Sequence, residues 1–297
     1  MLAAGGSAGA EATAAARREG LRALAQMADR PGRAPVRRLE APGPGGAVGL
    51  DLYAPAEASD GPQPALVFLH GGGWVAGGAE THGGLCGRLA EAARLTVVAV
   101  DYRLAPEHPF PAAFDDALAA VRWVGDKAAE LGIDPDRLAI GGDSAGGGLA
   151  AAASAALRDQ GGPMIAAQLL ICPILDLAEE SESRRALSEG FFLSRATMDR
   201  DVDAYCPPPL DRRDPRLSPL QAASFEGLPP TLLHTAEFDP FRDEGTAYAG
   251  RLKGAGVKVE ETCHAGMIHY FYALAQAIPY GEAAATAIGA QLRGLIG

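Results

Sequence analysis

Residues 137–147 read Arg-Leu-Ala-Ile-Gly-Gly-Asp-Ser-Ala-Gly-Gly, an apolar run followed by a serine that stands between glycines. This order predicts a strand, a tight turn and the start of an Ala-rich helix, because small neighbours tolerate the close backbone approach of such a turn. The turn would expose the hydroxyl of Ser144 at the edge of a sheet, beside a helix N-terminus that favours developing negative charge. Taken alone, the pattern is also compatible with a glycine-rich turn that carries no chemistry.

Apolar runs alternate with helical stretches along the chain, which predicts an α/β fold with a mostly parallel central sheet and helices on both faces. An opening hairpin is expected at Val36–Glu40 and Val48–Tyr53. Further strands are expected at Ala65–Leu69, Thr96–Val100, Leu138–Gly141, Ala167–Ile171, Thr231–Thr235 and Val257–Glu261. Helices are expected near residues 82–93, 112–125, 146–159, 241–253 and 282–295.

Two segments interrupt this alternation and predict a small, mostly helical cap. Residues 10–29 are rich in Ala and Arg and could form a helix, and a long charged connection follows the strand at 167–171. Connections of this length are often functional lids. The alternative is a disordered tail and a surface loop, but the apolar stretch Glu189–Leu193 favours a cap. We therefore divide the chain into an N-terminal cap segment (1–45), a first core part (46–178), a cap insertion (179–218) and a second core part (219–297).

The composition restricts the classes of partner. With 297 residues the chain can form one large α/β domain, and its net charge of −11 provides no electrostatic footprint for nucleic acid. No segment reaches the roughly 18 apolar residues of a membrane span, and residues 1–16 lack the features of a signal peptide, so we expect a cytoplasmic protein. The cysteines and histidines lie at no typical ligand spacing, so we expect no metal site and no cofactor.

Acyl transfer at Ser144 would require a base, an orienting carboxylate and N–H donors for an oxyanion. In hydrolases with a strand–serine–helix turn, the acid and then the histidine follow the serine in the chain. Asp239 lies just past the expected strand at 231–235 and is the candidate acid. Because Asp before Pro is also a common helix start, a capping role is an alternative, and Glu237 and Asp243 are competing carboxylates.

The candidate base is His269, which lies in the stretch after the last expected strand. His264 lies in the same stretch, closer to the strand end, and could instead be a surface residue. The position of His269 after both the serine and the acid favours it as the base.

The candidate oxyanion loop is His70-Gly-Gly-Gly-Trp74, directly after the expected strand at 65–69. Three consecutive glycines free the backbone to bring the N–H groups of Gly71 and Gly72 to one point, and Ala145 would supply a third donor. The alternative for a glycine run is a flexible turn, which would not explain the flanking histidine and tryptophan. We expect His70 to pin the loop by hydrogen bonds.

Five motifs in this order resemble the bacterial hormone-sensitive-lipase-like (family IV) carboxylesterases over roughly residues 45 to 290. They are HGGG at 70–73, DYRLAPEHPFPAA at 101–113, GDSAGG at 142–147, DPFRDEG at 239–245 and GMIH at 266–269. The resemblance implies an α/β-hydrolase fold with a helical cap and hydrolysis of short- to medium-chain acyl esters. It places the triad on Ser144, Asp239 and His269 and the oxyanion hole on Gly71, Gly72 and Ala145.

The resemblance also sets expectations about the pocket, the assembly and the alternatives. Members of this family often dimerise through the last strand, so the resemblance implies that this chain can form a homodimer. The residue after the histidine is usually glycine in this family and is Tyr270 here. We expect Trp74, Phe191, Phe192 and Tyr270 to line the substrate pocket, with ordinary core packing as the alternative. An amidase or lactonase with the same triad, or a non-catalytic receptor for a small ligand, are the competing functions.

Overall fold

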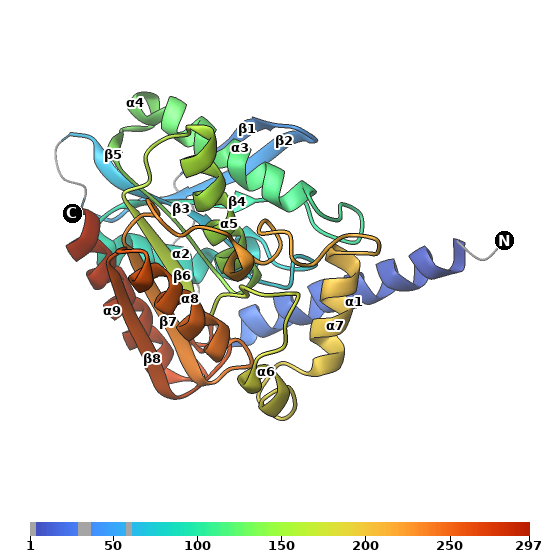
Figure 1. The fold of residues 1–297 in the computed structure, drawn as a ribbon. Helices are drawn as coiled ribbons and strands as arrows, with labels where there is room; N and C mark the ends of the chain where they lie inside the picture. Colours follow the sequence, from blue (N-terminus) through green and yellow to red (C-terminus); the bar gives the residue numbers. More distant parts are fainter. Residues whose placement is uncertain (1–3, 29–36, 58–60) are drawn as a thin grey trace.

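A computed structural model describes residues 4–28, 37–57 and 61–297 (Figure 1). In these ranges one eight-stranded sheet has the order β1-β2-β4-β3-β5-β6-β7-β8. The first three strands in this order pair antiparallel and the others pair parallel, as predicted for a mostly parallel sheet. The strands are β1 (Arg37–Gly43), β2 (Gly46–Tyr53), β3 (Gln63–Leu69), β4 (Thr96–Asp101), β5 (Ile133–Asp143), β6 (Ala167–Ile171), β7 (Thr231–Phe238) and β8 (Val259–Ile268).

The expected helices are confirmed, and shorter ones lie between them. The helices of the described chain are α1 (Ala4–Ala28), α2 (Ala79–Ala93), α3 (Ala112–Asp126), α4 (Ala128–Leu131), α5 (Ala145–Gln160), α6 (Glu182–Ala186), α7 (Arg195–Tyr205), α8 (Arg242–Gly254) and α9 (Pro279–Ile296). Two short 3₁₀ turns are η1 (Pro219–Gln221) and η2 (Phe271–Ala273). The first residue of the expected hairpin, Val36, lies outside the described residues.

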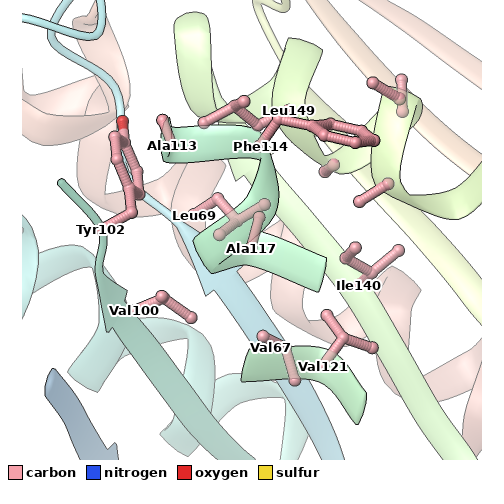
Figure 2. Close-up of a cluster of buried hydrophobic side chains, with 14 of the residues drawn as sticks. Val67, Leu69, Val100, Tyr102, Ala113, Phe114, Ala117, Val121, Ile140 and Leu149 are labelled. Carbon is pink, nitrogen blue, oxygen red and sulfur yellow. The ribbon is translucent and has the colours of Figure 1, made fainter. Parts of the chain in front are cut away.

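Strand β3 shows why the sheet needs helices on both faces. All seven of its residues are buried, as expected for a parallel strand in the middle of a sheet. Because side chains alternate along a strand, Val67 and Leu69 belong to one core layer and Leu66 and Phe68 to the other. In the first layer the strands pack against the apolar face of α3 (Figure 2), which contributes Ala113, Phe114, Ala117 and Val121. In the second layer they pack against α2 and α9.

Three strands run further than the sequence predicts. β5 continues to Asp143, β7 to Phe238 and β8 to Ile268, so each ends directly before a candidate site residue. The carboxyl ends of neighbouring parallel strands meet at one edge of a sheet. The fold therefore brings the segments after β5, β7 and β8 to the same edge.

Three helices lie beside this edge of the sheet: α1, α6 and α7. We call them the cap helices. In Figure 1, α1 and α7 lie side by side, and an ion pair at 3.3 Å joins Arg17 of α1 to Asp201 of α7. Ser181 and Ser194 cap α6 and α7 by accepting hydrogen bonds from backbone amides of the first turn, which is the local reason why these helices begin there. In the described part of the chain, no helix combines the length and apolar character needed to cross a membrane.

Candidate active site

Ser144 occupies the turn between β5 and α5 in a strained backbone conformation, with φ of 53° and ψ of −120°. This tight turn is sterically possible because two of the positions close to Ser144 are glycines. A Cβ atom on Gly142 would lie 2.4 Å from the carbonyl oxygen of Leu69, and one on Gly146 would lie 2.0 Å from the same atom. A residue with a side chain at either position would force β5 and α5 away from β3, so the glycines are structurally required.

A row of hydrogen bonds joins Ser144 to two residues from later strands. His269 directly follows β8, and its Nε2 lies 3.0 Å from Ser144 Oγ. Its Nδ1 lies 2.7 Å from Oδ2 of Asp239, which directly follows β7. All three side chains are buried. Because a carboxylate can only accept, Nδ1 carries the ring proton and Nε2 is left to accept the serine hydroxyl.

The structure places Asp239 to orient His269, whereas α8 begins after Phe241 without a side-chain cap, so the capping alternative for Asp239 is wrong. Its Oδ2 faces His269, while its Oδ1 accepts the backbone N–H of Phe241 at 2.8 Å, just before α8 begins. The competing carboxylates Glu237 and Asp243 accept the backbone amides of Gly266 in β8 and Ser183 in α6, at 2.7 and 2.8 Å. Neither is therefore placed to orient the histidine.

His264 is held away from the serine. It lies inside β8 and is buried, so the surface alternative is wrong. Its Nε2 lies 3.1 Å from Nδ1 of His234, and its Nδ1 lies 2.9 Å from the hydroxyl of Tyr280. Both ring nitrogens are thus occupied on the α9 side of the sheet.

The oxyanion loop differs from the expectation in one donor. The N–H of Gly71 donates to Oδ1 of Asp143 at 2.8 Å, so it cannot also serve a substrate oxygen, and its expected role is corrected. The next two glycines have positive φ angles of 123° and 65° and line the cavity over Ser144. Among the described residues, the amides of Gly72, Gly73 and Ala145 have no hydrogen-bond partner. The candidate donors beside Ser144 are therefore the amides of Gly72, Gly73 and Ala145.

The carboxylate of Asp143 ties the oxyanion loop to the serine turn. It is fully buried and is contacted by the Gly71 N–H, by the hydroxyl of Tyr272 at 2.9 Å and by Nε2 of His82 at 3.3 Å. Burial opposes its charge, but these partners together hold the pKa of its carboxyl below the usual value. The sequence marks Asp143 only as part of the serine motif and carries no sign of the contribution of Tyr272 or His82.

A model of the alpha/beta hydrolase fold matches residues 66–273. The chain belongs to the α/β-hydrolase family. It is similar to LipN, a carboxylic ester hydrolase of Mycobacterium tuberculosis, with 42% identity over 263 residues that cover 84% of this chain and 68% of that protein. An ethyl acetate hydrolase of Pseudomonas putida is 42% identical over 210 residues, which cover 70% of this chain and 65% of that one.

Solved structures agree with this membership. EstE1, a thermophilic carboxylesterase cloned from a metagenomic library, matches with a TM-score of 0.90 and 37% identity, covering 97% of this chain and 98% of that one. The esterase of the archaeon Pyrobaculum calidifontis matches with a TM-score of 0.89 and 37% identity, covering 96% and 91%. The resemblance to the hormone-sensitive-lipase-like esterases is therefore confirmed.

The cavity of this α/β hydrolase has a volume of about 260 Å³ and is lined by Ser144, by His269 and by residues of α1 and α7. Of the expected pocket residues, Trp74, Phe192 and Tyr270 line it. Phe191 does not, because its ring stacks on Phe238 at a centroid distance of 5.3 Å.

The backbone angle at Tyr270 shows why glycine is usual at the position after the histidine. Its φ is 69°, in the left-handed region that glycine adopts without strain. The tyrosine is nevertheless buried, stacks on Phe192 at 5.9 Å and contacts the His82 ring edge-on at 5.8 Å. These aromatic contacts offset the backbone strain and place a large ring in the cavity wall.

One group of potential metal ligands comes together in the described chain. The ligand atoms of Cys172, Asp239 and His269 lie within 4.8 Å of one another. A metal would need the thiolate form of the cysteine. Burial and then the charge of Asp239 raise the pKa of the Cys172 thiol well above its usual value, and the other two residues already bind each other. These residues fit a hydrogen-bonded row better than a metal site.

Two buried histidines predict a loss of stability in mild acid. Burial lowers the pKa of His70 and His234 to about 3, with smaller effects from His82 and His264, respectively. Between pH 6.5 and 3 the unfolded chain therefore binds protons that the folded chain does not, so the free energy of unfolding falls as the pH falls. Each histidine should contribute about 2 kcal/mol to this fall between pH 7.5 and pH 5.

Urea unfolding at the two pH values tests this prediction on wild type and His234→Gln. The variant cannot titrate at position 234, so we expect its stability to fall by about 2 kcal/mol less than that of wild type. An equal fall in both proteins would contradict a neutral His234.

Proposed function

We propose that this α/β hydrolase is a serine carboxylesterase that cleaves short- to medium-chain acyl esters. The observation that carries the proposal is the buried row Ser144–His269–Asp239, with hydrogen bonds of 3.0 and 2.7 Å. The relatives named above are themselves ester hydrolases. No cofactor takes part in the proposed reaction.

In the first half-reaction, Nε2 of His269 removes the hydroxyl proton as Ser144 Oγ attacks the ester carbonyl. Asp239 stays ionised, keeps the imidazole in the correct tautomer and stabilises the imidazolium. The imidazolium returns the proton to the leaving alcohol, and an acyl-enzyme remains. Water then attacks the acyl carbon in the same way, and the acid leaves.

The amides of Gly72, Gly73 and Ala145 form the proposed oxyanion hole. They surround the nucleophile from two sides, since the glycines follow β3 and the alanine begins α5. Preorganised donors cost no reorganisation during the reaction, and the loss of one donor typically costs about 3 kcal/mol of transition-state stabilisation. The hydrogen bond between Gly71 and Asp143 holds the loop in this position.

Assembly and location complete the proposal. We assign residues 1–45 and 179–218 to the cap as far as the structure describes them, except for β1, which pairs with β2 in the sheet; residues 1–3 and 29–36 lie outside the described residues. Strand β8 stands at the sheet edge and could pair with a second copy, so we propose a homodimer. Light scattering on the purified protein should give twice the chain mass, and a monomer at every concentration would contradict the dimer.

We propose a cytoplasmic location from the sequence.

Replacement of the nucleophile tests the mechanism. We expect Ser144→Ala to lower kcat for p-nitrophenyl butyrate by at least about 10⁴-fold with an unchanged circular dichroism spectrum, because the attacking atom is lost. His269→Ala should cause a comparable loss, whereas its matched control His264→Ala should keep most of the activity. Full activity of the serine variant would exclude the proposal, and the reverse result for the histidines would reassign the base.

The cavity volume predicts the preferred chain length. About 260 Å³ lies just below the range of roughly 300–1,000 Å³ typical of small-molecule sites, so only small esters should fit fully. In a series of p-nitrophenyl esters from acetate to palmitate, we expect kcat/KM to be highest for the short and medium chains. A maximum beyond about twelve carbons would contradict the expected preference for small esters.

A further inference from the structure

Two hollows lie on either side of one ion pair. The first is the cavity that contains Ser144, and the second is a groove of about 580 Å³ between α1 and α7. Arg17 of α1 and Asp201 of α7 line both hollows. The pair therefore forms a shared wall, and on its far side the groove offers apolar surface from Ala14, Ala16, Val75 and Ala204.

This wall is anchored beside the reacting groups. Oδ2 of Asp201 would lie 2.2 Å from a Cβ atom on Gly73, so the carboxylate packs directly against a glycine of the oxyanion loop. The same oxygen pairs with Nε of Arg17 at 3.3 Å. A chain that extends from a bound ester past Gly73 thus meets the ion pair before it can reach the groove.

Separating the two side chains of this ion pair would cost free energy. The Arg17 and Asp201 side chains are only 24% and 12% exposed, so separating them would leave a carboxylate that is largely buried and has lost its partner. Burial raises the pKa of Asp201 to about 6, against the charges of Arg17 and Arg200. Above pH 7 the carboxylate is therefore mostly ionised and is paired with Arg17, and its bulk stands between the cavity and the groove.

We propose that the Arg17–Asp201 ion pair closes the substrate cavity toward the α1–α7 groove and thereby limits the length of the alkyl chain that the enzyme accepts. This inference rests on the proposed esterase function. The chain can belong to the acyl part or to the alcohol part of the ester, since both are alkyl chains on the same carbonyl group. With the wall removed, a longer chain would gain burial of its methylene groups against the alanines and the valine of the groove.

Two substitutions at one position separate the size of the wall from its charge. Asp201→Ala removes the carboxylate group and opens the wall, whereas Asp201→Asn removes the charge and keeps the size. At about pH 8, we expect Asp201→Ala to raise the ratio of kcat/KM for p-nitrophenyl decanoate to that for the butyrate by about tenfold. The ratio for Asp201→Asn should stay within about twofold of wild type. If the alanine variant does not fold, Asp201→Ser and the double variant R17A/D201A test the same opening.

Glu80→Gln is the matched control for a general loosening of α1. Glu80 of α2 pairs with Arg22 of α1, so its replacement also removes an ion pair of α1. Because Glu80 lines neither hollow, this change should leave the chain-length profile unchanged. A second series of alkyl acetates shows whether the freed space takes the alcohol chain instead of the acyl chain, and a shift in either series supports the wall.

Three results would overturn the inference: an unchanged profile of Asp201→Ala in both series, an equal shift in Asp201→Asn, or an equal shift in Glu80→Gln. Wild-type protein that cleaves no ester at all would instead refute the proposed function. The two failures are therefore distinguishable.

Discussion

The close contact between the serine turn and the end of β3 is the constraint on which the site depends. β3 and β5 are neighbours in the sheet, so the loops that follow them leave the same edge side by side. They can lie this close only because Gly142 and Gly146 present no side chain to the carbonyl oxygen of Leu69. This contact sets Ser144, the proposed nucleophile, beside the proposed amide donors of the other loop.

A buried charge then fixes the two loops to each other. Asp143 belongs to the serine turn, yet its carboxylate accepts the N–H of Gly71 in the oxyanion loop. A charge in this position would be costly without partners, and Tyr272 and His82 supply them from the segment after β8 and from α2. The turn at Ser144, the glycine loop after β3 and the segment that follows His269 thus share one carboxylate. Loss of any one partner would leave a buried charge poorly compensated.

The sequence predicts the sheet and the meeting of the candidate site residues well because both follow simple rules. The motifs place Ser144, Asp239 and His269 at the ends of three parallel strands, and a strand end has one position in space once the sheet is known. The direction of the Gly71 amide depends on local torsion angles in a glycine run, which no pattern specifies. Phe191 and Phe192 lie in an irregular stretch without a side-chain period, so their sequence could not tell which ring faces the cavity.

The position of the cap helices is the part of the fold that the sequence pattern predicts least. Ion pairs between residues far apart in the sequence help to hold these helices in place. Arg18 of α1 binds Glu107 and the backbone carbonyls of Val75 and Ala105, next to the loop that bears the donors. Its neighbour Arg17 pairs with α7. Such pairs are worth little where water surrounds them and more where they are partly buried, as the Arg17–Asp201 pair is. The position of α1, and with it one wall of the cavity, therefore depends on a few arginine pairs together with the apolar contacts of Ala14, Leu21 and Ala28, while the sheet is fixed by apolar packing.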